Sequence, residues 1–263
     1  MLAGTDPYRD TIHILHVDDE VDFTDLTAAF LERKNDRFII ETAPSAADGL
    51  DRLANTTFDC IVSDYDMPAH NGIEFLETIR NEYPDLPFIL FTGKGSEEIA
   101  SEAISAGVTD YLQKKSGTDQ YAILANRIAN AVSAERMNAK ATRARQQLEQ
   151  ILETVPECIV QLNAEGEFTF ANERAAEVLG IERSEVTDRA YNDPEWDITD
   201  TKGNPIPDEE LPFQQVWASG DPLRGYRHAV RWPDGTKKIL RVDGAPLYDD
   251  NENIQYAIFA LSD

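Results

Sequence analysis

The amino-acid sequence predicts two domains joined by a long helix: a doubly wound five-stranded parallel α/β domain, then an α+β domain with an antiparallel sheet. Short apolar runs alternate with helical apolar spacing as far as residue 114, and residues 118–153 contain neither Gly nor Pro. After Pro156, apolar runs flank short turn sequences, as in hairpins. The 263 residues can supply two cores, at roughly 150 residues per domain.

The first domain is predicted from five short apolar runs. They cover residues 12–17, 38–42, 60–63, 88–91 and 111–112. The segments between them place apolar residues three and four apart, as Ile73, Leu76 and Ile79 do, and Ser45 and Ser96 are expected N-caps. Strand–helix alternation with short loops favours a parallel sheet covered on both faces.

Polar residues with phosphoryl-transfer chemistry follow four of these strands. They are Asp18, Asp19, Asp64, Thr92 and Lys114. The carboxyl ends of parallel strands share one edge of a sheet, so we expect these side chains to meet there. Three carboxylates would repel one another unless a divalent cation and a lysine shared the site. This arrangement suits transfer of a phosphoryl group onto an aspartate.

The linker/signalling helix predicted at residues 118–153 carries an apolar seam with heptad spacing that runs just past its end. The seam comprises Ala134, Met137, Ala141, Ala144, Leu148, Ile151 and Val155. Three alanines make a strong coiled coil unfavourable, so we expect a weak or switchable parallel dimer. A linker helix that packs on its own domain is the alternative.

The second domain is predicted to be α+β, with helices on one face of a curved antiparallel sheet. Its expected strands are residues 158–162, 168–170, 226–232, 237–242 and 254–261. Its expected helices are residues 172–179 and 208–218. We expect Cys60 and Cys158, one in each domain, to be buried free thiols.

The composition is strongly acidic, with 49 Asp and Glu against 24 Lys and Arg and a net charge of −25. Such a surface repels nucleic acid, so we expect no nucleic-acid partner. With only 8 lysines, it resembles proteins of halophilic archaea; an ordinary acidic cytosolic protein is the alternative. No stretch approaches the roughly 20 apolar residues of a membrane span and no signal peptide is present, so a cytoplasmic location is expected.

The ordered motifs VDDE, SDYDMP, FTG and YLQKK resemble the receiver domain of two-component response regulators, over about residues 10–130. The resemblance implies a flavodoxin-like fold with Asp64 as phosphoacceptor. It implies Mg²⁺ held by Asp18, Asp19, Asp64 and the main-chain carbonyl of Asp66. Thr92, Lys114 and the aromatic switch residue Tyr111 would then respond to phosphorylation; a plain core tyrosine is the alternative for Tyr111.

Two features differ from the usual receiver pattern. Lys115 stands where the family usually has proline, so we expect a trans peptide bond after Lys114. Asp66 and Lys94 lie two residues beyond Asp64 and Thr92. We hypothesise that they form an ion pair at the pocket mouth and tune the lifetime of the aspartyl phosphate.

Residues 146–263 resemble a PAS domain. The resemblance rests on ILETVPECIVQLNAEGEFTFAN, the following AAEVLG, and the hairpin RWPDGTKKILRV. It implies a pocket and dimerisation through the preceding helix. Trp217, Tyr226, Trp232 and Phe259 are candidate pocket residues, with a core role as the alternative. The sequence contains no Asn-Cys-Arg flavin motif. We expect His228 to be an ordinary strand histidine rather than a haem ligand. The sequence does not identify the PAS ligand.

The leading functional interpretation is a phosphorylation-controlled signalling module whose partner is a histidine kinase. One alternative is the N-terminal receiver–PAS part of a longer sensor histidine kinase, and another is a non-switching PAS dimer scaffold. No kinase motif is apparent, so an enzyme is not expected beyond self-catalysed phosphotransfer and autodephosphorylation. The ending Leu261-Ser262-Asp263 resembles the start of a further signalling helix, so we expect a longer native chain.

The charge yields a first prediction about stability. Because molar salt shortens the Debye length to about 3 Å and screens self-repulsion, the thermal unfolding midpoint should rise with KCl concentration. Circular dichroism during heating measures it. A midpoint that is indifferent to the removal of molar KCl would contradict the halophilic interpretation.

Overall fold

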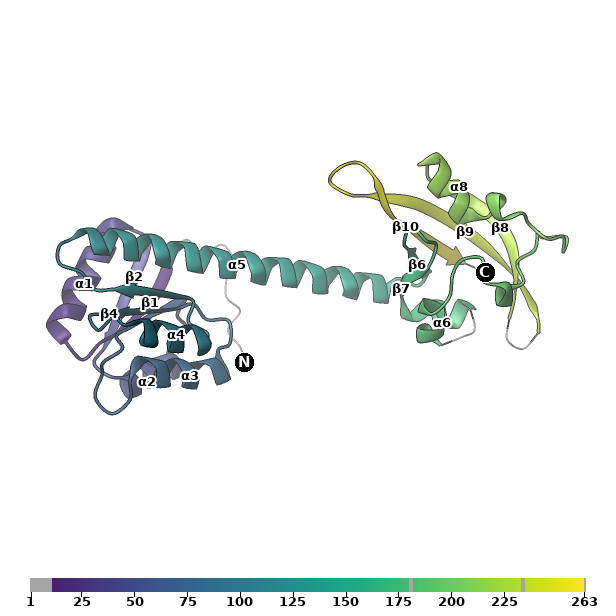
Figure 1. Cartoon of the computed structure of the whole chain (residues 1–263). Coiled ribbons are helices and arrows are strands. Elements are labelled where there is room, and N and C mark those ends of the chain that lie inside the picture. The colour runs from purple at the N-terminus through teal and green to yellow at the C-terminus, as the bar shows by residue number, and fades with distance from the viewer. Residues whose placement is uncertain (1–10, 180–181, 233–234, 263) are drawn as a thin grey trace. The chain divides into compact units, whose positions relative to one another are not determined.

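The computed structural model describes residues 11–179, 182–232 and 235–262 (Figure 1). The chain folds into two compact units, Met1–Arg143 and Ala144–Asp263. Each unit has its own sheet and its own hydrophobic core, as the sequence predicts.

The first unit contains a five-stranded parallel sheet in the order β2-β1-β3-β4-β5. The strands are β1 (Ile12–Val17), β2 (Phe38–Ala43), β3 (Cys60–Ser63), β4 (Phe88–Thr92) and β5 (Asp110–Gln113). All five predicted strands are confirmed to within a residue at each end. The order reverses between β1 and β3, which opens a crevice at the carboxyl ends of those strands.

Helices cover both faces of this sheet (Figure 1). The first-unit helices are α1 (Val21–Lys34), α2 (Ala46–Asn55), α3 (Gly72–Glu82), α4 (Glu97–Ser105) and the start of α5 (Asp119–Thr154). Strand residues alternate between two cores: Ile14 and Phe91 pack with Leu124 of α5, whereas Val17 and Leu90 pack on the other face. The expected caps form, since Ser45 and Ser96 accept hydrogen bonds from the backbone of α2 and α4.

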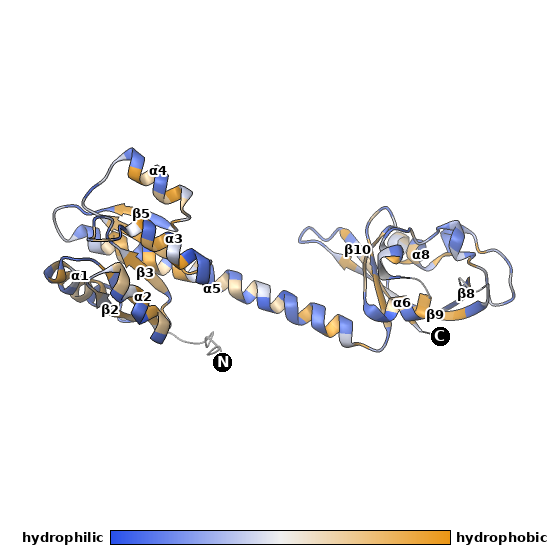
Figure 2. Cartoon of the chain, turned by 90° about the horizontal axis from the view of Figure 1, so that it is seen from below, coloured by the Kyte–Doolittle hydropathy of each residue, from blue (hydrophilic) through white to orange (hydrophobic). Residues whose placement is uncertain are grey.

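Helix α5 changes its environment along its length. Its buried residues end at Val132. One turn later, Nη2 of Arg136 donates to Asp59 Oδ1 and to the carbonyl of Thr11, both at 2.9 Å. Beyond that point Met137, Leu148 and Ile151 are exposed in the single chain, and Figure 2 shows hydrophobic residues there only between hydrophilic ones.

The second unit contains a five-stranded antiparallel sheet in the order β7-β6-β10-β9-β8. Its strands are β6 (Cys158–Leu162), β7 (Phe168–Ala171), β8 (Leu223–Arg231), β9 (Lys237–Tyr248) and β10 (Ile254–Ser262). Strand β9 is twice as long as predicted, because Gly244 and Pro246 do not interrupt its pairing with β10.

The helices of the second unit are shorter and more numerous than predicted. They are α6 (Glu173–Leu179), α7 (Arg183–Thr187), η1 (Pro194–Trp196), η2 (Asp208–Glu210) and α8 (Pro212–Ser219). The single helix predicted at residues 208–218 is wrong, because Leu211 is extended (ψ 148°) and Pro212 starts a new helix. Proline has no N–H to continue the preceding turn and is favoured at a first helical position.

The two cysteines, Cys60 and Cys158, are both buried free thiols, as expected. Among residues 11–179, 182–232 and 235–262, no helix is long and apolar enough to cross a membrane.

Asn172 joins the end of α5 to the second sheet and is fully buried. Its Nδ2 donates to the carbonyls of Leu152 and Glu157, each at 2.9 Å. Its Oδ1 accepts from the backbone N–H of Ile159 at 3.0 Å and of Ala175 at 3.2 Å. The amide thereby uses both of its donors and both acceptor positions, so no hydrogen-bonding capacity remains unused.

Replacing Asn172 by Ala should lower the unfolding free energy of the second unit by about 2–4 kcal/mol, because it removes the four hydrogen bonds of a fully buried amide and leaves a cavity in its place. All three tryptophans lie in this unit, so tryptophan fluorescence in urea reports its unfolding alone. Gln147→Ala, at an exposed site on α5 within the same unit, is the control and should change little. Equal midpoints for the two variants would contradict a structural role for the Asn172 amide.

Candidate functional site

The five polar residues predicted from the strand ends gather at the carboxyl edge of the first sheet. Asp18 and Asp19 follow β1, Asp64 follows β3, Thr92 ends β4, and Lys114 follows β5. Backbone hydrogen bonds prolong the pairing into the loops: Asp64 N–H donates to the Val17 carbonyl and Lys114 N–H to the Thr92 carbonyl, both at 2.8 Å. The crevice edge is therefore held by the sheet itself.

Lys114 bridges two buried carboxylates. Its Nζ lies 2.7 Å from Oδ2 of Asp18 and 2.9 Å from Oδ1 of Asp64. Burial alone would lower the pKa of Lys114, but its hydrogen bonds and charge interactions with these two carboxylates raise it overall. The lysine is therefore a cation at neutral pH.

Three carboxylates form a cluster around this ammonium group. Asp18, Asp19 and Asp64 each bring one oxygen within 4.8 Å of the others, and only Asp19 is exposed. Burial raises the pKa of Asp18, although the hydrogen bond and charge of Lys114 oppose that rise. Clustered carboxylate oxygens open to water on one side are the donor set that Mg²⁺ takes in proteins, so the residues fit this ion.

The loop between β3 and α3 holds the Asp64 carboxylate in place. The backbone N–H of Asp66 donates to Asp64 Oδ2 at 2.9 Å. Gly72, at the start of α3, lies so close that a Cβ there would fall 2.2 Å from the Asp64 carbonyl oxygen. Only glycine permits this approach of helix and loop.

The hypothesised ion pair between Asp66 and Lys94 is present. Both side chains are more than half exposed. The backbone N–H of Lys94 also donates to the Thr92 hydroxyl oxygen at 3.2 Å, which ties this loop to the site. The described residues contain no cis peptide bond, so the bond after Lys114 is trans, as expected from Lys115.

Tyr111 lies on β5, partly buried against the core on the α3 side. Its hydroxyl oxygen is buried without a hydrogen-bond partner in the part of the chain that the structure describes, and burial raises the pKa of the phenol. A Cβ on Gly95 would fall 3.1 Å from this hydroxyl. The unpaired hydroxyl is compatible with a ring that changes position, which is the behaviour expected of a switch residue.

Two residues near the site were not predicted as part of it. The ammonium of Lys114 lies 4.3 Å from the ring centroid of Phe23, a cation–π distance. His16 is completely buried, and burial followed by the charge of Lys114 lowers its pKa to about 3. His16 faces the Ile12 and Ile14 side of β1, so strand alternation would have indicated its burial.

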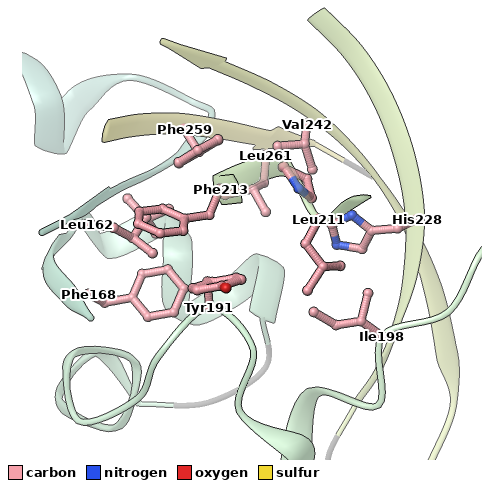
Figure 3. Close-up of a pocket in the computed structure, with 12 residues that line it drawn as sticks. Leu162, Phe168, Tyr191, Ile198, Leu211, Phe213, His228, Val242, Phe259 and Leu261 are labelled. Carbon is pink, nitrogen blue, oxygen red and sulfur yellow. The ribbon is translucent and has the colours of Figure 1, made fainter. Parts of the chain in front are cut away.

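The second unit contains a cavity of about 70 Å³ (Figure 3). Its lining is Val160, Leu162, Phe168, Tyr191, Ile198, Leu211, Pro212, Phe213, His228, Val242, Phe259 and Leu261. Of the four predicted pocket residues, Phe259 lines it, whereas Trp217, Tyr226 and Trp232 do not. Trp232 lies beyond the end of β8, and its indole N–H donates to the Val178 carbonyl at 3.1 Å.

Comparison with known proteins matches both parts of the chain. Residues 14–129 match the response regulator receiver domain family, and residues 146–263 match the PAS fold family. The transcriptional regulatory protein FixJ of Bradyrhizobium diazoefficiens is 31% identical over 49% of this chain and 62% of its own length. The response regulator SaeR of Staphylococcus aureus is 31% identical over 39% of this chain and 43% of its own length.

Solved structures with a similar chain include a response regulator receiver domain protein from Methanospirillum hungatei. It is 26% identical, with a TM-score of 0.44, and the match covers 49% of this chain and 98% of that one. This chain spans less than two thirds of the length of FixJ and of SaeR. On the two family matches, the chain contains a response regulator receiver domain followed by a PAS domain.

Proposed function

We propose that the receiver domain accepts a phosphoryl group on Asp64 from a histidine kinase and that helix α5 relays the phosphorylated state to the PAS domain. The observation that carries the proposal is the Lys114 ammonium between Asp18 and Asp64, at 2.7 and 2.9 Å. This contact places a fixed positive charge beside the carboxylate that would receive the phosphoryl group.

The proposed transfer replaces one bond to phosphorus by another. A carboxylate oxygen of Asp64 attacks the phosphorus of a phosphohistidine, the P–O bond forms as the P–N bond breaks, and the histidine leaves. Asp18, Asp19, Asp64 and the Asp66 carbonyl would hold Mg²⁺. When bound, Mg²⁺ supplies positive charge that offsets the negative charge on the phosphoryl oxygens. Lys114, which lies beside Asp64, would bind a phosphoryl oxygen.

The switch would follow from a change of partners around Asp64. The Thr92 hydroxyl, now an acceptor from Lys94 N–H, can donate to a phosphoryl oxygen. Tyr111 lies on β5, which pairs with β4, the strand that ends at Thr92. Its hydroxyl has no hydrogen-bond partner among the described residues, so its ring can change position when Thr92 moves. Differential contacts in the two states are what a population shift requires.

Helix α5 supports the relay, because the same helix packs in the receiver core and is hydrogen-bonded to the PAS domain at its last turn. Its first half is buried in the receiver domain as far as Val132, and its last turn is bonded to the PAS sheet through Asn172. The seam with Met137, Leu148 and Ile151 is exposed in the single chain, which supports a homodimer through this helix and the PAS domain. The net charge of −25 supports a salt-rich cytoplasm as the setting and no nucleic-acid partner.

The first test is phosphorylation by acetyl phosphate with Mg²⁺. The wild-type chain should gain the mass of one acid-labile phosphoryl group, and EDTA present from the start should prevent this gain, whereas Asp64→Asn should gain none. Asp51→Asn, at an exposed site on α2, is the matched control and should be labelled normally. Labelling of Asp64→Asn would place the acceptor elsewhere. No labelling of the wild type would favour the non-switching scaffold.

The second test concerns the Asp66–Lys94 ion pair, which lies where hydrolytic water would enter. Asp66→Asn and Lys94→Gln should each shorten the half-life of the aspartyl phosphate by about threefold or more, and the double variant should add little. The phosphorylated fraction is followed by intact mass after removal of the donor. Arg52→Gln breaks the ion pair with Glu41 and serves as the control. An unchanged half-life in both single variants would exclude a kinetic role.

A further inference from the structure

The ammonium group of Lys114 has three close neighbours, and only two of them are charged. Its Nζ lies 2.7 Å from Oδ2 of Asp18 and 2.9 Å from Oδ1 of Asp64. The same atom lies over the ring of Phe23, 4.3 Å from the centroid, and the lysine side chain is only 17% exposed. An ammonium group has three N–H donors. With two of them on the carboxylates, the aromatic face of Phe23 is the nearest remaining partner among the described residues.

The ring of Phe23 is held in place by the elements around it. Phe23 lies in the first turn of α1, where its backbone N–H donates to the Glu20 carbonyl at 2.9 Å. Its ring centroid is 5.9 Å from that of Phe91, a fully buried residue of β4. The buried ring of His16 on β1 meets it edge to face, with the centroids 6.4 Å apart. Contacts with two different strands therefore fix the ring beside the ammonium of Lys114.

The two carboxylates are partners that Lys114 would have to share. Asp64 is the proposed phosphoacceptor, and both Asp18 and Asp64 are proposed ligands of Mg²⁺, so a bound cation or a phosphoryl group would draw oxygens away from the ammonium. The ring of Phe23 has no such competing role, because it is uncharged and offers no oxygen ligand. It attracts the ammonium through the negative face of its π system. Of the three partners, the ring is therefore the one that would stay the same in both states.

We propose that Phe23 is a positioning residue, whose ring keeps the ammonium of Lys114 beside Asp64 while the carboxylates exchange partners. The inference rests on the proposed function, because it places Phe23 in the service of the same phosphoryl transfer. With the ammonium held in the crevice, Lys114 is in place to bind a phosphoryl oxygen as charge develops on it. Phe23 acts on the reaction only through Lys114.

Substitutions separate this role from that of an ordinary core residue, which any apolar side chain of similar size could fill. Phe23→Leu and Phe23→Met keep apolar bulk but remove the π face, whereas Phe23→Tyr keeps the face. Phe30→Leu is the matched control, because Phe30 lies on the same helix and its ring stacks on Tyr121 with the centroids 4.6 Å apart. It removes an aromatic contact about two turns further along α1. If Phe23→Leu fails to fold, Phe23→Met takes its place.

The first experiment locates the ammonium without any phosphorylation. The full chain has 8 lysines, so ¹³C-lysine labelling resolves the ε-methylene signal of Lys114, which is assigned by its loss in Lys114→Arg. The ring current shifts protons above an aromatic face upfield. We expect this shift for Lys114 in the wild type, Phe23→Tyr and Phe30→Leu, and its loss in Phe23→Leu and Phe23→Met. Addition of Mg²⁺ alone should leave the shift in place. A wild-type signal that lacks the shift, or loses it with Mg²⁺, would overturn the proposal.

The second experiment follows the rate of labelling by acetyl phosphate at saturating Mg²⁺, by intact mass. Phe23→Leu should slow labelling by about fivefold, because the cation–π contact no longer holds Lys114, and Phe23→Tyr should stay within about twofold of the wild-type rate. Phe30→Leu should be labelled at the wild-type rate. An unchanged rate in Phe23→Leu, or an equal loss in Phe23→Leu and Phe23→Tyr, would contradict the role of Phe23 alone. A wild type that is not labelled at all would contradict the proposed function and, with it, the purpose of this contact.

Discussion

The receiver domain depends on one electrostatic contact, the ammonium of Lys114 held between the carboxylates of Asp18 and Asp64. These residues come from three strand ends that are far apart in the chain, and Asp18 and Asp64 are almost fully buried. Two buried carboxylates so close together repel each other and are poorly solvated, and the ammonium between them offsets both costs. The lysine makes the acidic crevice compatible with folding and leaves it ready for a second cation.

Helix α5 combines two structural roles that its sequence separates clearly. Its first part is amphipathic and contributes Leu124 and Ile128 to the receiver core. After the hydrogen bonds of Arg136, its apolar residues become isolated and exposed, and its last turn is held by Asn172. A continuous helix transmits displacement or rotation along its axis, because every backbone hydrogen bond links neighbouring turns. The proposed relay from the crevice to the second domain rests on this burial pattern.

Asn172 and His228, which are both buried in the PAS domain, differ in how their polar atoms are satisfied. Asn172 has every donor and acceptor satisfied by backbone groups, which is the expected state of a structural residue. His228 keeps Nδ1 unpaired among the described residues, against an apolar cavity and at a cost in stability. The contrast shows that burial alone does not provide a polar side chain with hydrogen-bond partners.

The sequence by itself determined the strands of the receiver sheet, the N-caps Ser45 and Ser96, and the meeting of Asp18, Asp64 and Lys114. These features follow from local periodicity and from the rule that parallel strands end at one edge. Only the tertiary structure decided that Leu211 separates two helices, that Trp217 and Trp232 lie outside the cavity, and that His228 lies in its wall. A cavity is what remains after side chains from distant segments have packed, so no local pattern specifies its lining.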